Sequence, residues 1–177
     1  MTIQSNTTDP QDELFDIVDT NDVVVGSATR REVHANKKLI HRSINVLVYN
    51  KTGALFFQKR SPTKDTDREK WTISCSGHVE RGGDYKEAAH RELQEELGVD
   101  MEIEKVDKFV CFAPYETEMA MVFKASYEGP FLLNETEISS GTFFTQNELL
   151  KQLEEGKIKL SFMAEKILGK IGWLKGY

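Results

Sequence analysis

The segment from residue 71 to residue 100, WTISCSGHVERGGDYKEAAHRELQEELGVD, constrains the fold more than any other part of the chain. A glycine-rich stretch leads into a pattern that predicts a helix over residues 85–97. Asp84 can cap the N-terminus of this helix while Glu87 reaches back, a variant of the capping box, and Gly98 supplies the C-terminal stop. The segment therefore predicts a loop followed by a helix with well-marked ends.

Three glutamates of the predicted helix, Glu92, Glu95 and Glu96, lie on one face because residues three and four apart are neighbours on a helix. An apolar stripe lies beside them, formed by Ala89, Leu93 and Leu97. Like-charged pairs on a helix cost roughly 0.2 to 0.5 kcal/mol each in water, and more when they are partly buried. A divalent cation removes this repulsion, and clustered carboxylates suit Mg²⁺ or Mn²⁺. Taken alone, the same pattern also fits a solvated acidic face.

The rest of the sequence predicts strands around this helix. Two hairpins are expected, one from residues 14–19 and 23–26 and one from residues 42–50 and 54–60. Further strands are expected at residues 71–74, 108–115, 117–126 and around 141–145, and helices at 146–155 and 162–172. This order predicts an α/β (α+β) fold in which a mixed β-sheet is sandwiched between α-helices. We expect a flexible N-terminal arm over residues 1–13 and a single domain over residues 14–177.

Composition limits the class of partner. The 177 residues carry a formal charge of −6, with a pI near 5.3, which disfavours nonspecific binding to nucleic acid. No apolar run is long enough to span a bilayer, and the polar start lacks the features of a signal peptide, so we expect a cytoplasmic protein that does not bind membranes. Two cysteines, Cys75 and Cys111, are too few for a disulfide framework and are expected to be reduced.

The stretch from Gly77 to Val99, and above all RELQEELGV at residues 91–99, resembles the Nudix box. This is the loop–helix signature of a superfamily that acts on diphosphate-containing substrates with a divalent metal. The resemblance implies a Nudix fold, with Arg91 orienting one carboxylate by a salt bridge and with Mg²⁺ or Mn²⁺ bound by Glu92, Glu95 and Glu96. One position departs from the pattern, because Gly83 stands where the box has a glutamate, and this affects the loop more than metal binding.

A second set of residues resembles the isopentenyl-diphosphate isomerase branch of this superfamily. That branch has two histidines seven residues apart, a Gly-His at the start of the box and a Glu-x-Glu pair on a later strand, which together build a second metal site. The matching residues here are His34, His41, His78, Glu116 and Glu118. Imidazole ligands favour transition metals, so the resemblance implies Mn²⁺, Zn²⁺ or Fe²⁺ at this site. Arg60 and Lys64, in FFQKRSPTK, match the spacing of the pair that holds the diphosphate; a solvated basic loop is the alternative.

The isomerase pattern fails at two places. Ser76 stands where the isomerase has a proton-transferring cysteine, and the neighbouring Cys75 points to the opposite face of an extended strand. A serine hydroxyl is a much poorer acid and base than a thiol near neutral pH. Near the C-terminus, Phe162 or Met163 lies where the isomerase has a tryptophan that stabilises a carbocation.

These features lead to a Nudix hydrolase that cleaves a diphosphate linkage in a small molecule through water activated by a divalent metal. The residues expected to take part in catalysis are Glu95, Glu96, Glu118 and Ser76, without an assignment of the general base. The alternative is an isopentenyl-diphosphate isomerase in which Glu118 protonates the double bond and Ser76 replaces the usual thiol. A diphosphate or nucleotide sensor without catalytic activity is a third possibility. Neither the substrate nor the oligomeric state follows from the sequence.

Overall fold

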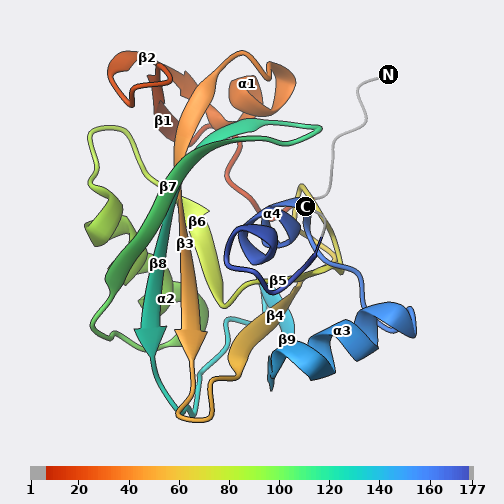
Figure 1. The fold of residues 1–177 in the computed structure, drawn as a ribbon. Helices are drawn as coiled ribbons and strands as arrows, with labels where there is room; N and C mark the ends of the chain where they lie inside the picture. The colour runs from red at the N-terminus through yellow and green to blue at the C-terminus, as the bar shows by residue number, and fades with distance from the viewer. Residues whose placement is uncertain (1–6, 176–177) are drawn as a thin grey trace.

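The computed structural model describes residues 7–175 and contains one mixed sheet with helices on both faces (Figure 1). The strands are β1 Leu14–Val18, β2 Val24–Thr29, β3 Ile40–Tyr49, β4 Leu55–Arg60, β5 Trp71–Thr72, β6 Cys75–His78, β7 Glu104–Phe112, β8 Thr117–Ser126 and β9 Ile138–Phe144. The helices are α1 Arg30–Ala35, α2 Tyr85–Leu97, α3 Gln146–Glu154 and α4 Phe162–Lys170.

Strand β3 organises the sheet. It runs parallel to β8 along its whole length, from the pair Ile40–Thr117 to the pair Tyr49–Ser126, and antiparallel to β1 and β6. Strand β4 pairs with β5 and β9, and it joins β3 only at Tyr49–Leu55. The combination of parallel and antiparallel pairs confirms the predicted mixed sheet.

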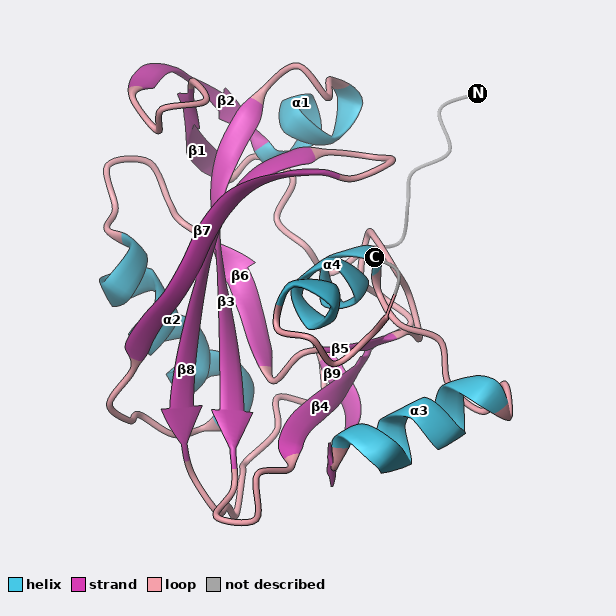
Figure 2. Ribbon diagram, viewed as in Figure 1, coloured by secondary structure: helices cyan, strands magenta, loops and turns pink. Residues whose placement is uncertain are grey.

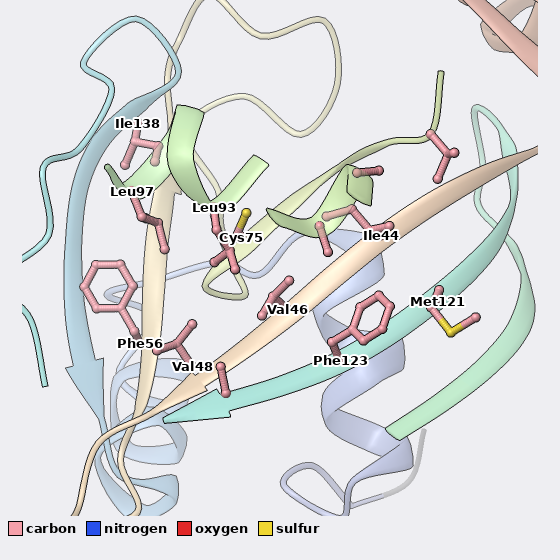
Figure 3. Packing of buried hydrophobic residues seen from close by; sticks show 14 residues of the cluster. Ile44, Val46, Val48, Phe56, Cys75, Leu93, Leu97, Met121, Phe123 and Ile138 are labelled. Atoms are coloured by element: carbon pink, nitrogen blue, oxygen red, sulfur yellow. The ribbon is translucent and has the colours of Figure 1, made fainter. Parts of the chain in front are cut away.

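Alternation along β3 explains why helices cover both faces of the sheet. Every second residue, Ile44, Val46 and Val48, packs with the apolar stripe of α2 (Figure 3). The intervening Leu47 packs with residues of α4 and α3. Figure 2 shows where these two helices lie relative to β3. The predicted sandwich of a sheet between helices is therefore confirmed.

The ends of α2 form largely as the sequence predicts. The Asp84 carboxylate accepts hydrogen bonds from the backbone N–H groups of Lys86 and Glu87, and Gly98 ends the helix in the left-handed conformation, at a φ of 67°. The predicted return bond from the Glu87 side chain to the Asp84 N–H is absent from the described part of the chain. The capping prediction is thus correct for Asp84 and wrong for Glu87.

Three other features differ from the sequence prediction. Helix α1 was not predicted, although Thr29 and Glu32 form a reciprocal capping box at its start. The strand expected at residues 71–74 is shorter, β5 Trp71–Thr72, and the separate strand β6 Cys75–His78 was not predicted. Between them, the buried Ser74 hydroxyl accepts a hydrogen bond from the Val48 N–H and donates one to the Phe56 carbonyl. Strand β7 begins at Glu104, before the predicted start at residue 108.

The described part of the N-terminal segment contacts the domain. Of the arm expected over residues 1–13, residues 1–6 lie outside the described residues. Asp9 is buried, the Thr8 N–H donates to the Thr63 carbonyl, and the Arg30 N–H donates to the Glu13 carbonyl. These bonds anchor residues 7–13 to the domain. Within residues 7–175, no helix has the length and apolar character needed to cross a bilayer.

Candidate functional site

A polar cavity of about 380 Å³ runs along β6, which pairs with β3. Most of the residues expected to act in catalysis or binding line it: Arg60, Lys64, Ser76, His78, Glu92, Glu95, Glu116 and Glu118. His34, His41 and Glu96 lie behind this lining layer. The structure therefore brings together residues that are up to 84 positions apart, since both Glu118 and His34 belong to one site.

Gly77 makes room for the first glutamate of α2. A Cβ atom at position 77 would lie 2.2 Å from the carboxylate of Glu92, so only glycine lets this side chain occupy its place beside β6. Arg91 contacts the carboxylates of Glu92 at 3.1 Å and Glu95 at 3.2 Å, and it donates to the His78 carbonyl. Arg91 thus ties both glutamates to β6, as the resemblance implied.

Glu96 is the most enclosed of the three glutamates. Its Oε2 atom accepts hydrogen bonds from the Gln58 amide, at 2.9 Å, and from the Ser76 N–H, at 3.1 Å. Burial and the neighbouring charge of Glu137 raise the pKa of Glu96 to about 7, and burial together with Glu96 raises the pKa of Glu92 well above its ordinary value. The positive charge of Arg91 beside Glu92 does not outweigh burial and like charge, so both pKa values stay raised. A divalent cation would stabilise the ionised forms of these carboxylates, which fits a metal site.

The second group forms because sheet register places its members on one face. Glu118 lies opposite His41 in the β3–β8 ladder, and His78 lies opposite Ser43 in the β3–β6 ladder. Helix α1 adds His34, whose Nε2 atom is 2.9 Å from Oε2 of Glu116. The corresponding distance from His41 Nε2 to the same oxygen is 3.4 Å.

Several atoms of this group have the environment expected of metal ligands. His34 Nε2, His41 Nε2 and Glu116 Oε2 are buried, and within the described residues none of them makes a hydrogen bond of acceptable geometry. Ligands that each lie about 2.1 Å from an ion are separated by about 3.0 to 3.4 Å. The observed separations have this size, and the mixture of imidazole and carboxylate suits a transition metal. One ligand atom each from His41, His78, Glu116 and Glu118 also lies within 4.8 Å of the others.

Burial and like charge shift the pKa values in this group. Burial and the charge of Glu116 raise the pKa of Glu118 to about 8. Burial alone would lower the pKa of His34, but its contacts with Asp65 and Glu116 outweigh this effect and raise the pKa to about 9. The pKa of His78 lies well below its ordinary value because the ring is buried and faces the positive charge of Arg30.

Two residues that sequence reasoning missed stand behind the histidines. Asp65 Oδ2 lies 3.2 Å from His34 Nδ1 and accepts a hydrogen bond from Arg30 Nε at 2.9 Å. Arg30 also lies 3.2 Å from His78 Nδ1. The capping box at Thr29 could have revealed the helix that carries Arg30, but nothing in the spacing of the loop at residues 61–70 distinguishes Asp65 from its acidic neighbours.

The two predicted diphosphate-binding residues differ in their surroundings. Lys64 is buried, and its ammonium group contacts Asp9 at 2.5 Å and Glu137 at 3.2 Å, so its charge is neutralised within the protein. Arg60 lines the cavity while its Nε donates to the Thr66 carbonyl. Their role in holding a diphosphate stays a prediction.

The two faces of β6 separate Ser76 from Cys75. Ser76 lines the cavity, whereas Cys75 has no exposed surface and packs in the core against α2 (Figure 3). Burial and the nearby glutamates also raise the pKa of the Cys75 thiol. Cys75 therefore does not supply the thiol that the isomerase pattern requires.

Comparisons with known proteins agree with this fold and site. A family model described as NUDIX domain matches residues 39–164. The chain is 35% identical over 133 residues to Isopentenyl-diphosphate Delta-isomerase 2 of Photorhabdus laumondii, covering 72% of this chain and 75% of that protein. It is 29% identical over 157 residues to a Nudix hydrolase of Deinococcus radiodurans, covering 87% and 91%. A crystal structure from Deinococcus radiodurans superposes with a TM-score of 0.76 at 27% identity, covering 88% of this chain and 97% of that one.

A mixed sheet between helices, with a glutamate-bearing helix beside a polar cavity, defines an enzyme of the Nudix class. The chain belongs to the NUDIX domain family. Its relatives include both a Nudix hydrolase and an isopentenyl-diphosphate isomerase.

Proposed function

We propose that this enzyme hydrolyses a diphosphate linkage of a small molecule and requires Mg²⁺ or Mn²⁺. The observation that carries the proposal is that two acidic groups, one on α2 and one at the start of β8, line the same cavity. The net charge of −6 supports a small-molecule substrate rather than nucleic acid, and we place the enzyme in the cytoplasm.

Glu92, Glu95 and Glu96 would hold the catalytic ion, and His34, His41, Glu116 and Glu118 would hold a second ion of a transition metal. A divalent ion supplies charge neutralisation for the phosphoryl oxygens and lowers the pKa of water. The protein's own residues orient the reacting groups, because Arg91 fixes two of the carboxylates. Glu95 is half-exposed at the cavity, so its carboxylate can accept the proton of an attacking water.

Isopentenyl-diphosphate isomerisation is the second candidate. The convergence of His34 and His41 on Glu116 favours it, as does the resemblance to a relative that carries this name. The side chain at position 76 argues against it, since the cavity receives a hydroxyl there and the nearest thiol faces the core. Hydrolysis needs no thiol, so we rank it first.

Incubation of the full chain with isopentenyl diphosphate, and in parallel with a panel of nucleoside and sugar diphosphates, separates the candidates. Each reaction contains Mg²⁺ or Mn²⁺, and both released phosphate and dimethylallyl diphosphate are measured. We expect phosphate release from at least one compound. Isomer formation without phosphate release would select the isomerase instead.

The double variant Glu95→Gln, Glu96→Gln tests the glutamate group, and Glu87→Gln provides a matched control on the same helix, in its exposed first turn. We expect the double variant to lose hydrolysis and the control to retain it. Equal activity in both would show that the α2 carboxylates do not take part.

A further inference from the structure

We propose that His78 is not a metal ligand in this protein, and that Arg30 fixes it as a hydrogen-bond donor facing the cavity. Asp65, the partner of Arg30, fixes His34 in the opposite sense, as a metal ligand. One buried ion pair thus assigns different roles to two histidines. The assignment of His34 rests on the second metal site of the proposed function, whereas the assignment of His78 can be tested without metal.

The contact between Arg30 and His78 determines which ring nitrogen carries the hydrogen. Arg30 Nη1 lies 3.2 Å from His78 Nδ1. A guanidinium group has five N–H donors and no acceptor, so Nδ1 must be the acceptor in this bond. A neutral imidazole that accepts at Nδ1 carries its hydrogen on Nε2. Ligation through Nε2 needs a free lone pair there, and the two states exclude each other.

Arg30 is held too firmly to turn away from His78. Its side chain is buried, and it contacts Asp65 at 2.9 Å, Glu13 at 3.3 Å and Asp9 at 3.6 Å. Removing Arg30 from His78 would break contacts to three carboxylates in a buried setting, which is costly. The surroundings of Arg30 therefore preserve the donor that faces Nδ1.

The other member of the Arg30–Asp65 ion pair faces His34 and fixes its hydrogen on the opposite ring nitrogen. The His34 Nδ1 atom lies 3.2 Å from Asp65 Oδ2, an acceptor, so Nδ1 carries the hydrogen. In the neutral ring, the form that binds a metal, Nε2 then offers a lone pair toward the site, 2.9 Å from Glu116 Oε2. A carboxylate behind a histidine is the usual arrangement that orients a metal-binding imidazole. Asp65 is thus a positioning residue for His34.

His78 Nε2 is farther from the Glu116 carboxylate than the corresponding atoms of His34 and His41, although a ring nitrogen of His78 lies within 4.8 Å of a ligand atom of His41, Glu116 and Glu118. His34 Nε2 and His41 Nε2 lie 2.9 and 3.4 Å from Glu116 Oε2, and all three atoms are buried without an acceptable hydrogen bond in the described chain. His78 Nε2 lies farther out, 3.9 Å from Glu116 and 3.7 Å from Glu118. A donor at this place can bond to the Glu118 carboxylate or to an oxygen of the substrate.

Nitrogen NMR of the imidazole rings tests the state of His78 in the metal-free full chain. The ring signals are assigned by their loss in His78→Gln. We expect His78 Nε2 at the shift of a protonated ring nitrogen and Nδ1 at the shift of an unprotonated one. The reverse pattern would overturn the proposal. The measurement does not depend on turnover, so it determines the state of His78 even if the proposed hydrolysis is not observed.

Zn²⁺ titration by calorimetry tests the ligand assignment. The variant His78→Gln keeps an N–H donor close to the Nε2 position but removes the ring lone pair, and His34→Gln removes a proposed ligand. His90→Gln is the matched control, because His90 lies on the surface and pairs with Asp100. We expect His78→Gln and the control to bind Zn²⁺ within about threefold of the parent chain and His34→Gln to lose at least about tenfold.

Equal losses in His78→Gln and His34→Gln would overturn the distinction between the two histidines. An absence of Zn²⁺ uptake by the parent chain would overturn the assignment of His34 and remove the second metal site. Hydrolysis at the glutamate group is measured separately by phosphate release in Mg²⁺, so the two failures can be told apart. In the variant Asp65→Ala, we expect Zn²⁺ affinity to fall by about 10- to 100-fold while the ring nitrogens of His78 keep their shifts.

Discussion

Replacing Gly77 with alanine should remove activity while leaving the fold largely intact. The new Cβ atom would lie 2.2 Å from the Glu92 carboxylate, against roughly 3.5 Å for an ordinary non-bonded contact, so the carboxylate must move by about 1.3 Å. A displacement of about 1 Å at a reacting centre costs about 100-fold in rate, which corresponds to about 2.7 kcal/mol of activation free energy. The free energy of unfolding should fall by only about 1 kcal/mol, because the obstructing group is the end of a flexible side chain.

The assay compares phosphate release and the melting temperature in Gly77→Ala and in Gly26→Ala. Gly26 is a suitable control because a Cβ atom there meets nothing within 4 Å. We expect the control to match the parent chain in phosphate release. If Gly77→Ala keeps activity within threefold, the position of Glu92 does not matter for catalysis and the reasoning is refuted. If its loss of activity follows loss of folding, the site explanation is equally wrong.

Three further predictions concern charge and metal. Asp67 is buried, which alone would raise its pKa, but hydrogen bonds from Lys70, Tyr115 and the Phe162 N–H lower the pKa below its ordinary 3.8. The contribution of the ionised Asp67 to stability is therefore fully present above about pH 3.8, and it is lost as the pH falls through the lower pKa of the folded state. Asp67→Asn should lower the free energy of unfolding by about 1 to 3 kcal/mol at pH 7. In acid unfolding curves, the difference in stability between this variant and the parent chain should vanish at low pH. Asp9→Asn removes a carboxylate that neutralises Lys64, so the affinity for inorganic pyrophosphate, measured by calorimetry, should rise severalfold. The control Asp12→Asn, which changes an exposed side chain, should leave this affinity unchanged. Equal affinities in the two variants would contradict this prediction. Mg²⁺ at about 100 times its dissociation constant should raise the free energy of unfolding by about 2.7 kcal/mol. The melting temperature should rise accordingly, and EDTA should reverse the rise. An unchanged melting temperature would argue against the metal site.

Much of the fold was predictable because its signals are local. The caps Asp84 and Gly98 and the 3.6-residue spacing of the α2 stripe depend only on neighbours in sequence, and the structure confirms them. The apolar residues over 42–50 likewise predicted a strand, which the structure confirms as β3. The separation of β5 from β6 at Ser74 was not predictable, because it accompanies hydrogen bonds between the Ser74 hydroxyl and the backbone of β3 and β4, which are distant in sequence.

The residues of the candidate site were likewise predictable, whereas their surroundings were not. Spacing alone placed Glu92, Glu95 and Glu96 on one helical face, and the resemblance supplied the histidine and Glu-x-Glu positions. Neither could show that Glu96 is enclosed by Gln58 while Glu95 remains half-exposed, because that follows from the position of α2 on the sheet.

The sequence by itself determined the elements, the glutamate-bearing helix and the identities of the residues that reach the cavity. Only the tertiary structure decided that Arg30 and Asp65 lie between His34 and His78, and that Asp9 neutralises Lys64. The physical reason is that hydrogen-bond direction and charge pairing depend on atoms a few ångströms apart in space. Folding brings those atoms together from positions up to 55 residues apart in the sequence.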